Sequence, residues 1–248
     1  TPCGTLFPYT TLFRSGMIYR PVRERSPQEI TTQTAQTLPG TGYEEVSFLS
    51  LSVSDYSELP ALLKAEHDLL NELQVNYSFP SMRLDSFTEE IADYASNVRK
   101  SGITFAPESG SPRLRDVINK NISDDDLFNA IEIALRKGWR LLKFYFMIGL
   151  PTETKEDIDA LADLMKAVVE KSRQWGNVRF NVSVSAFSPK AHTPFQWEAQ
   201  NSKTELEEKI DRLNKRLARI RQIHLSWRDP DVSYLECVLG RGDRRTAQ

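Results

Sequence analysis

The sequence predicts an α/β protein in which parallel strands alternate with helices. Segments rich in β-prone apolar residues alternate with segments of helical periodicity between residues 45 and 187, which is typical of strand–helix–strand units. The run Leu141–Ile148 is almost continuously apolar, as expected of a strand covered on both faces. Polar turn residues follow the predicted strands. The chain has 248 residues, of which 40% are hydrophobic and 27% charged, and this is the composition of a globular protein.

The net charge and the number of cysteines argue against several classes of protein. The net charge of −2 gives the chain as a whole no electrostatic footprint for nucleic acid. No apolar run is long enough to span a membrane, and no signal peptide is visible. The two cysteines, Cys3 and Cys237, argue against a disulfide framework and predict a cytoplasmic protein. They are also too few for a zinc or iron–sulfur site made by this chain alone, so we expect no metal ligands here.

The first fifteen residues are expected to be non-native. The string TLFPYTTLFRS, residues 5–15, matches the translation of a common DNA sequencing adapter. We therefore expect the natural sequence to begin at Gly16, and segments of this kind are left out of fold reasoning. The alternative is a natural N-terminal strand, because Leu, Phe, Tyr and Thr favour strands.

Local signals place the elements of the first half. Ser26-Pro27-Gln28-Glu29 is a capping box with proline at the first helical position, and it predicts a helix that stops at Leu38-Pro39-Gly40. A strand over 45–52, a helix over 60–73 and a strand over 76–84 should follow. Another capping box, Ser86–Glu89, predicts a helix that ends near Lys100.

The second half continues the alternation. A short strand at 103–105 enters a polar turn that opens a helix, and Ser123 caps the next helix, which ends at Lys137-Gly138. A strand over 141–148, a helix over 155–175 and a strand over 178–187 follow. Because the carboxyl ends of parallel strands meet at one rim, these five strands should bring together five side chains or turns: Asp55, Arg83, Glu108, Gly149 and His192.

Beyond residue 200 we expect one long charged helix over 205–225 and a short strand over 232–239. The helix carries a basic face, which could bind RNA or be neutralised by acidic neighbours, and the second interpretation is favoured. The basic residues are Lys209, Arg212, Lys215, Arg216, Arg219 and Arg221.

Five strand-end motifs resemble, in order, those of radical S-adenosylmethionine (SAM) proteins. They read LSLSVSDY, FPSMRLDSF, GITFAPESGSPRLRDVINK, FYFMIGLPTET and AFSPKAHTPFQWEAQ. The resemblance covers Gly16 to about Gln248 and is greatest to the subgroup that usually carries an N-terminal cobalamin-binding-like domain. It implies a partial (β/α)6 TIM-type barrel with the first strand missing or replaced. We therefore expect a barrel domain over 16–200 and a C-terminal extension over 201–248, which starts a further region.

The resemblance also implies cofactors. Family members hold a [4Fe-4S] cluster on a CxxxCxxC loop and cleave SAM to a 5'-deoxyadenosyl radical. This chain lacks that loop, so we expect a fragment that is catalytically inactive as written, although its parent is an enzyme. Cobalamin use by the parent stays open, and the resemblance gives no substrate.

Carried over motif by motif, the resemblance implies a set of SAM-binding residues. Ser52, Ser54 and Asp55 match the motif at the SAM amino group, and Arg83 would pair with the SAM carboxylate. The remaining motifs place Glu108 and Ser109 near ribose and methionine, and Met147, Ile148 and Gly149 on adenine. The turn from Ser188 to Pro194, with Pro189 and His192 as its candidate site residues, would lie near adenine and substrate.

Other interpretations of these residues remain. Glu108 could simply be an acid at a helix N-terminus, Arg83 a surface residue and His192 a hydrogen-bonded loop residue. For the whole chain, the main alternative is a non-catalytic α/β binding module whose basic C-terminal helix contacts RNA or a protein. A third hypothesis is a non-radical TIM-type enzyme that uses Glu108 as general acid or base.

Overall fold

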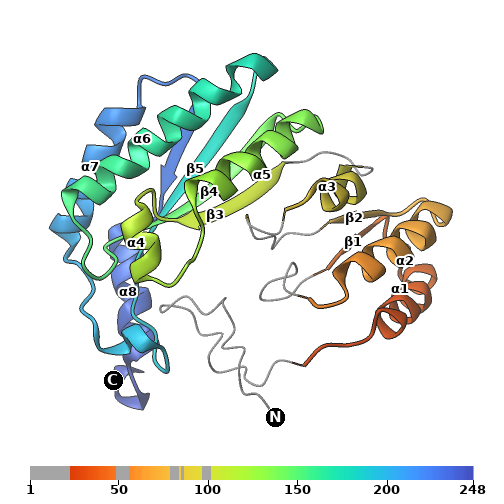
Figure 1. Cartoon of the computed structure of the whole chain (residues 1–248). Helices are drawn as coiled ribbons and strands as arrows, with labels where there is room; N and C mark the ends of the chain where they lie inside the picture. The colour runs from red at the N-terminus through yellow and green to blue at the C-terminus, as the bar shows by residue number, and fades with distance from the viewer. Residues whose placement is uncertain (1–22, 49–55, 79–83, 85–86, 97–101, 248) are drawn as a thin grey trace, which may run out of the picture.

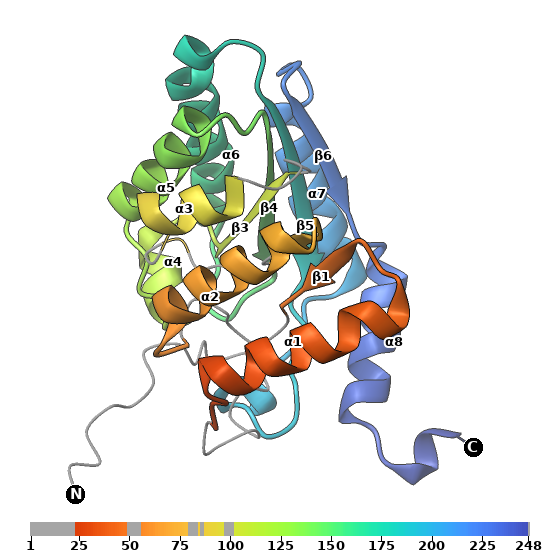
Figure 2. The ribbon, with the colours of Figure 1, turned by 90° about the vertical axis from the view of Figure 1, so that its right-hand side faces the viewer.

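A computed structural model describes residues 23–48, 56–78, 84, 87–96 and 102–247. In the N-terminal part, helices α1 (Pro27–Thr41), α2 (Leu59–Glu72) and α3 (Glu89–Ser96) accompany two short strands, β1 (Glu45–Ser47) and β2 (Asn76–Ser78). The two strands pair in parallel. Helices α1 and α2 run side by side, and Thr34 Oγ1 donates a hydrogen bond to Glu66 Oε1 between them at 3.0 Å (Figures 1 and 2).

Local sequence signals predict the start of helix α1 correctly but not its end. The Ser26 capping box is present as predicted, with both of its reciprocal hydrogen bonds. The predicted stop at residues 38–40 is wrong, because α1 runs through Pro39 and ends at Gly42, whose φ of 67° is left-handed. Glycine adopts this conformation without steric cost, which makes it a helix terminator.

The C-terminal part forms a four-stranded parallel sheet. Its strands are β3 (Ile103–Glu108), β4 (Leu141–Ile148), β5 (Arg179–Ala186) and β6 (Ile223–Trp227), and each is paired with its successor in the chain. The connecting helices are α4 (Pro112–Val117), α5 (Asp124–Arg136), α6 (Lys155–Ser172) and α7 (Lys203–Leu217). Short turns η3 (Arg173–Trp175), η4 (Pro194–Trp197) and η5 (Arg244–Ala247), with helix α8 (Pro230–Arg241), complete the described chain. Parallel neighbours in chain order are the arrangement of a partial barrel, and the α/β prediction is confirmed.

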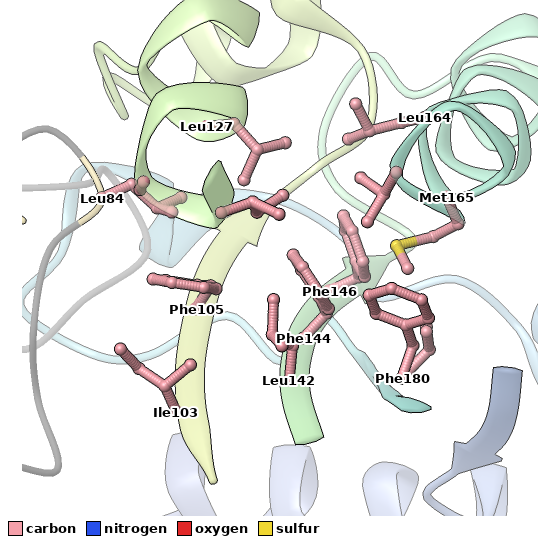
Figure 3. Close-up of a cluster of buried hydrophobic side chains, with 14 of the residues drawn as sticks. Leu84, Ile103, Phe105, Leu127, Leu142, Phe144, Phe146, Leu164, Met165 and Phe180 are labelled. Carbon is pink, nitrogen blue, oxygen red and sulfur yellow. The ribbon is translucent and has the colours of Figure 1, made fainter. Parts of the chain in front are cut away.

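The outer face of the sheet, covered by α5, α6 and α7, holds the hydrophobic core (Figure 1). Phe105, Phe144, Phe146 and Phe180 each have at most 1% of their surface exposed. Figure 3 shows these rings and Leu142 close to Leu127, Leu164 and Met165 of the covering helices. The strands are therefore held in place from the helical side.

The inner face of the same strands is polar. Lys143, Tyr145 and Met147 alternate with the buried residues of β4, and Tyr145 is 47% exposed. Asn181, Ser183 and Ser185 occupy the matching positions of β5. The expectation that Leu141–Ile148 is covered on both faces is thus wrong for the described part of the chain. A near-continuous apolar run also fits a strand whose inner-face side chains are large and amphipathic.

The region after residue 200 differs most from the prediction. The single helix expected over 205–225 is instead α7, a turn and strand β6, which continues the sheet beside β5. The strand expected over 232–239 is instead helix α8. Asp229 caps it by accepting a hydrogen bond from the Asp231 amide, and Pro230 stands at its first position. The buried residues Ser233 and Cys237 lie four apart, which is a helical spacing.

Candidate functional site

Glu108, the last residue of β3, has an unusual backbone conformation where the chain enters the turn to α4. Its φ is 67°, which is costly for a residue with a side chain, and the β3–β4 register shifts between Phe105 and Glu108. The Glu108 side chain is 12% exposed, and Lys120 Nζ lies 3.3 Å from its Oε1 atom. Strained backbone persists where the surroundings fix it and is common at functional sites. Glu108 therefore stands at the rim as predicted, with an ionic partner that the sequence analysis did not identify.

The neighbouring residues explain how this turn is fixed. The buried Ser109 Oγ accepts a hydrogen bond from the Ser111 amide at 3.1 Å. The fully buried Arg115 donates to the Ser109 carbonyl oxygen at 3.2 Å and also pairs with Asp124. Gly110 has no room for a side chain, since a Cβ atom there would lie 2.1 Å from Leu161 Cα of α6. Ser109 thus has a structural role in the turn, beside any contact with a ligand.

The end of β4 contributes Met147, Ile148 and Gly149. Ile148 is 1% exposed and belongs to the main core, so only its backbone faces the rim. Gly149 has a φ of 77°, and its amide donates to Glu153 Oε1 at 2.8 Å. A Cβ atom at Gly149 would lie 3.0 Å from Asn201 Oδ1, so the chain itself already requires glycine here. Met147 is half-buried and faces the sheet's inner side.

The segment after β5 contributes Ser188, Pro189 and His192. Pro189 is buried, whereas His192 is exposed, with a φ of 63° and its amide donating to Gln196 Oε1 at 3.3 Å. The predicted loop role of His192 is compatible with this hydrogen bond. Ser188 is 7% exposed, and its hydroxyl has no hydrogen-bond partner among the described residues.

A second, smaller hydrophobic cluster joins these three turns. It comprises Leu114, Ile118, Leu150, Phe187 and Phe195, from α4, the turn after β4 and the segment after β5. Met147 packs against it. The carboxyl ends of β3, β4 and β5 are therefore held together by shared packing, as the parallel arrangement predicts. Of the predicted site residues, Ser52, Ser54, Asp55 and Arg83 lie outside the described residues.

A cavity of about 490 Å³ opens on the inner face where β4, β5 and β6 end. We call it the strand-end hollow. Its lining residues are Tyr145, Met147, Ser183, Val184, Ser185, Ala186, Ser188, Lys190, Ser226, Trp227, Arg228 and Glu236. Hydroxyl groups, two aromatic residues and three charges thus surround a space large enough for a small molecule.

The charged residues of the hollow form one network. Glu236 of α8 pairs with Lys190 Nζ through one carboxylate oxygen and with Arg228 NH1, at 2.7 Å, through the other. The Lys190 hydrogen bond holds the pKa of the Glu236 carboxyl below its usual value, against the opposing effect of burial. Two cations share one carboxylate, so the network carries a net charge of +1.

Sequence reasoning placed Met147 and the turn from Ser188 to Pro194, which contributes Ser188 and Lys190, at this hollow, but it missed most of the other lining residues. The alternation of Ser183 and Ser185 with valine in strand β5 was a signal that polar side chains point to one face. Arg228 and Glu236 had no comparable signal, because β6 and α8 were themselves predicted wrongly.

The basic face of α7 is largely neutralised, as the favoured interpretation predicted. Lys209 pairs with the buried Glu153 at 2.6 Å, and Arg212 binds Asp159 through two hydrogen bonds of 2.7 and 2.5 Å. Arg216 also pairs with Asp159. The hydrogen bonds from Arg212 are the main reason that the pKa of Asp159 falls to about 2. Arg212 and Arg216 thus serve the α6–α7 contact, and Lys209 binds the turn before α6. These ion pairs remove the main support for an RNA-binding surface on this helix.

The residues present do not fit an iron–sulfur cluster. The sequence holds two cysteines, and of these Cys237 is buried on α8. No group of three or more metal-ligating side chains occurs among the described residues. Among those same residues, no helix is long and apolar enough to cross a membrane.

The fold and site together define a partial parallel α/β barrel with a ligand-sized hollow at the strand ends. The sequence profile of the Radical SAM superfamily matches residues 8–165, and the chain belongs to this superfamily. It is a superfamily of enzymes that use SAM and a [4Fe-4S] cluster. The non-radical TIM-type hypothesis is therefore set aside.

Two curated relatives match most of the chain. The chain is 30% identical over 231 residues to an uncharacterized protein of Methanocaldococcus jannaschii, covering 93% of this chain and 49% of that protein. It is 28% identical over 202 residues to the tRNA-2-methylthio-N(6)-dimethylallyladenosine synthase of Thermotoga petrophila, covering 77% of this chain and 43% of that protein. The chain thus spans about half the length, or less, of these curated relatives.

Two solved structures share the fold. Streptococcus suis SuiB bound to its precursor peptide SuiA has a TM-score of 0.58 at 12% identity, covering 92% of this chain and 50% of that one. The radical SAM methyltransferase TsrM from Kitasatospora setae, solved with cobalamin and a [4Fe-4S] cluster, has a TM-score of 0.53 at 14% identity, covering 69% and 33%.

Proposed function

We propose that this chain is a fragment of a radical SAM enzyme that supplies the SAM- and substrate-facing wall of the barrel and lacks the cluster-binding loop. The observation that carries the proposal is the gathering of the carboxyl ends of β3, β4 and β5 beside the strand-end hollow. Ligands of parallel α/β folds bind at this end of the strands. Membership of the superfamily identifies SAM as the ligand to expect at this end of the barrel.

The surroundings of Glu108 support SAM binding at this rim. Glu108 offers a carboxylate that could accept the ribose hydroxyls while Lys120 balances its charge. Met147 and the segment around Pro189 and His192 would lie on the adenine side. These assignments, with Ser52, Ser54, Asp55, Arg83, Ser109, Ile148 and Gly149, remain proposals.

The cluster cannot be assigned in the same way, because two cysteines cannot supply three thiolates. We propose that residues 1–15 replace the segment that carries CxxxCxxC in the natural protein. In the family, the cluster supplies the electron that cleaves SAM. This chain as written is therefore proposed to be inactive. Cobalamin in the parent stays a proposal, supported only by the family subgroup and the shared fold of TsrM.

The test compares two chains under anaerobic reconstitution with iron and sulfide. The chain as printed should bind no [4Fe-4S] cluster and release no 5'-deoxyadenosine from SAM. A second chain, in which the natural gene sequence preceding Gly16 replaces residues 1–15, should turn brown and cleave SAM. Cluster-dependent cleavage by the printed chain, or an upstream gene sequence without CxxxCxxC, would contradict the proposal.

The repaired chain also tests the assignment of Glu108. Glu108→Gln should weaken SAM binding about tenfold, because a charged hydrogen-bond acceptor is lost. Glu132→Gln changes an exposed carboxylate of α5 and is the matched control, so it should leave SAM affinity unchanged. Isothermal titration calorimetry measures both. Equal affinities in the two variants would remove Glu108 from the site.

A further inference from the structure

The strand-end hollow has a charge pattern that the SAM assignment does not explain. Lys190 comes from the segment after β5, Arg228 from the end of β6 and Glu236 from helix α8. All three side chains are between one third and just over one half exposed, so solvent and solutes reach them. The segment after β5 thus meets the consecutive elements β6 and α8, some forty residues later in the chain, at one accessible site.

The network is short of negative charge. A single carboxylate serves both a lysine and an arginine, and one positive charge is left over. Elsewhere in the described C-terminal part, Lys203 of α7 has Asp231 as its own partner, with Nζ and Oδ2 2.6 Å apart. The surplus in the hollow would be balanced by an anion that Lys190 and Arg228 share. Arg and Lys together suit the oxygens of carboxylates and phosphates.

The hydroxyl groups of the hollow point to the same ligand chemistry. Ser183 and Ser226 hydroxyls lie 3.1 Å apart across β5 and β6 and satisfy each other. The Ser188 hydroxyl is more than nine-tenths buried, lines the hollow and has no partner among the described residues. It is a hydrogen-bond donor available to an oxyanion placed between strand β5 and the two cations.

The aromatic lining residues indicate what the rest of an anionic ligand is like. Tyr145 is 47% and Trp227 44% exposed, and both line the hollow. Exposed aromatic faces beside a cationic site bind the flat or apolar body of a ligand, while the charged groups fix its orientation. Met147 adds an adaptable apolar contact.

We propose that the strand-end hollow binds the oxyanion of a small substrate, a carboxylate or a phosphate, through Lys190, Arg228 and Ser188. Glu236 pairs with both cations when no anion is bound, and it competes with the anion for them. That the ligand is a substrate rests on the proposed function, whereas the anion site itself does not. Because Glu236 lies on α8, this helix sets how tightly the hollow binds an anion.

The experiment titrates the full chain at low ionic strength with inorganic phosphate and, separately, with acetate. Two-dimensional NMR follows the indole N–H of Trp227, which is assigned with Trp227→Phe. Lys190→Met and Arg228→Met should each weaken anion binding about tenfold or more. Glu236→Gln should strengthen it, because a competing carboxylate is removed. Tighter phosphate binding identifies a phosphate ligand, and tighter acetate binding a carboxylate.

Two controls keep the result decisive. Lys203→Met removes a cation outside the hollow and should leave the titration unchanged. Lys190→Arg keeps the charge and should retain binding, while thermal melting checks that each variant is folded. Absence of binding by the parent chain, equal weakening by Lys203→Met, or weakening by Glu236→Gln would overturn the proposal. The phosphate titration needs neither cluster nor SAM, so its failure is separate from failure of the radical SAM assay.

Discussion

The two faces of the four-stranded sheet differ in what they contribute. On the outer face, Phe144 and Phe146 of β4 are at most 1% exposed beneath α5 and α6. On the inner face, Tyr145 of the same strand is 47% exposed and lines the strand-end hollow. Adjacent residues of one strand therefore belong to different environments. The comparison indicates that the outer face provides stability, whereas the inner face lines the hollow that we propose as a ligand site.

The largest expected effect tests this difference within one strand. Phe144→Ala should destabilise the protein by about 3–5 kcal/mol, because it removes a fully buried ring and leaves a cavity. Tyr145→Ala is the matched neighbour and should cost less than about 1 kcal/mol. Urea unfolding followed by circular dichroism measures both. Similar losses in the two variants would show that the inner face is also part of the core.

A second pair of substitutions tests the packing of the rim against the outer helices. Gly110→Ala should cost about 1–3 kcal/mol or more, because the new Cβ would lie 2.1 Å from the Leu161 Cα of α6 and backbone cannot easily yield. Gly240→Ala, in helix α8, meets no atom within 4 Å. It should stabilise the protein by about 0.5–1 kcal/mol through helix propensity. Thermal melting should show a lower melting temperature for Gly110→Ala and a higher one for Gly240→Ala. An unchanged melting temperature in Gly110→Ala would contradict the close approach between Gly110 and α6.

The smallest effect concerns the ion pairs between α6 and α7 in the outer layer. Folding lowers the pKa of the Asp159 carboxyl from its ordinary value of 3.8 to about 2, chiefly through the hydrogen bonds with Arg212. A lowered carboxyl pKa contributes stability that is complete above pH 3.8 and is lost as the pH falls toward 2. The contribution should be about 1 kcal/mol, because the pair is partly solvent-screened.

Asp159→Asn should therefore flatten the dependence of unfolding free energy on pH between about 4 and 2. Asp163→Asn, on the same helix, changes a more exposed carboxylate that also pairs with Arg216 and serves as the control. Chemical denaturation at a series of pH values measures both. An unchanged slope in Asp159→Asn would show that other carboxylates dominate acid unfolding.

Part of this fold was predictable because its signals are local. Capping boxes at Ser26 and Ser123 are satisfied within one helical turn, so the sequence around them is sufficient. Strands β4 and β5 are long, and their apolar residues pack on the outer face, which gives a strong pattern. The rim position of Glu108 followed from the order of strand, turn and helix.

Strand β6 and helix α8 were not predictable on the same basis. Ile223–Trp227 becomes a strand through its backbone ladder with β5, a partner some forty residues earlier in the chain. Tertiary pairing of this kind overrides local periodicity. Helix α8 carries exposed apolar residues such as Val232 and Leu235, which made the segment resemble a strand. Asp229 and Pro230 carry the start signal of this helix, a capping side chain followed by proline at the first helical position.

The candidate site was predictable to the same extent as the strands that build it. Glu108 and Met147 stand at strand ends, where the pattern placed them. The ionic partner Lys120 and the Glu236 network depend on distances between separate elements, which no local pattern contains. Ser188 lies in the predicted turn after β5, but only the three-dimensional structure shows that its hydroxyl is buried and has no partner among the described residues.

The polar inner face affects how the sequence of such a barrel can evolve. Residues such as Ser183 and Ser185 bury little apolar surface, so replacing them removes little of the folding free energy. A sheet whose outer side already holds it together can accept new inner side chains without first gaining stability elsewhere. Substitutions at a few inner-face positions of β4, β5 and β6 can therefore change which small molecule the same scaffold binds.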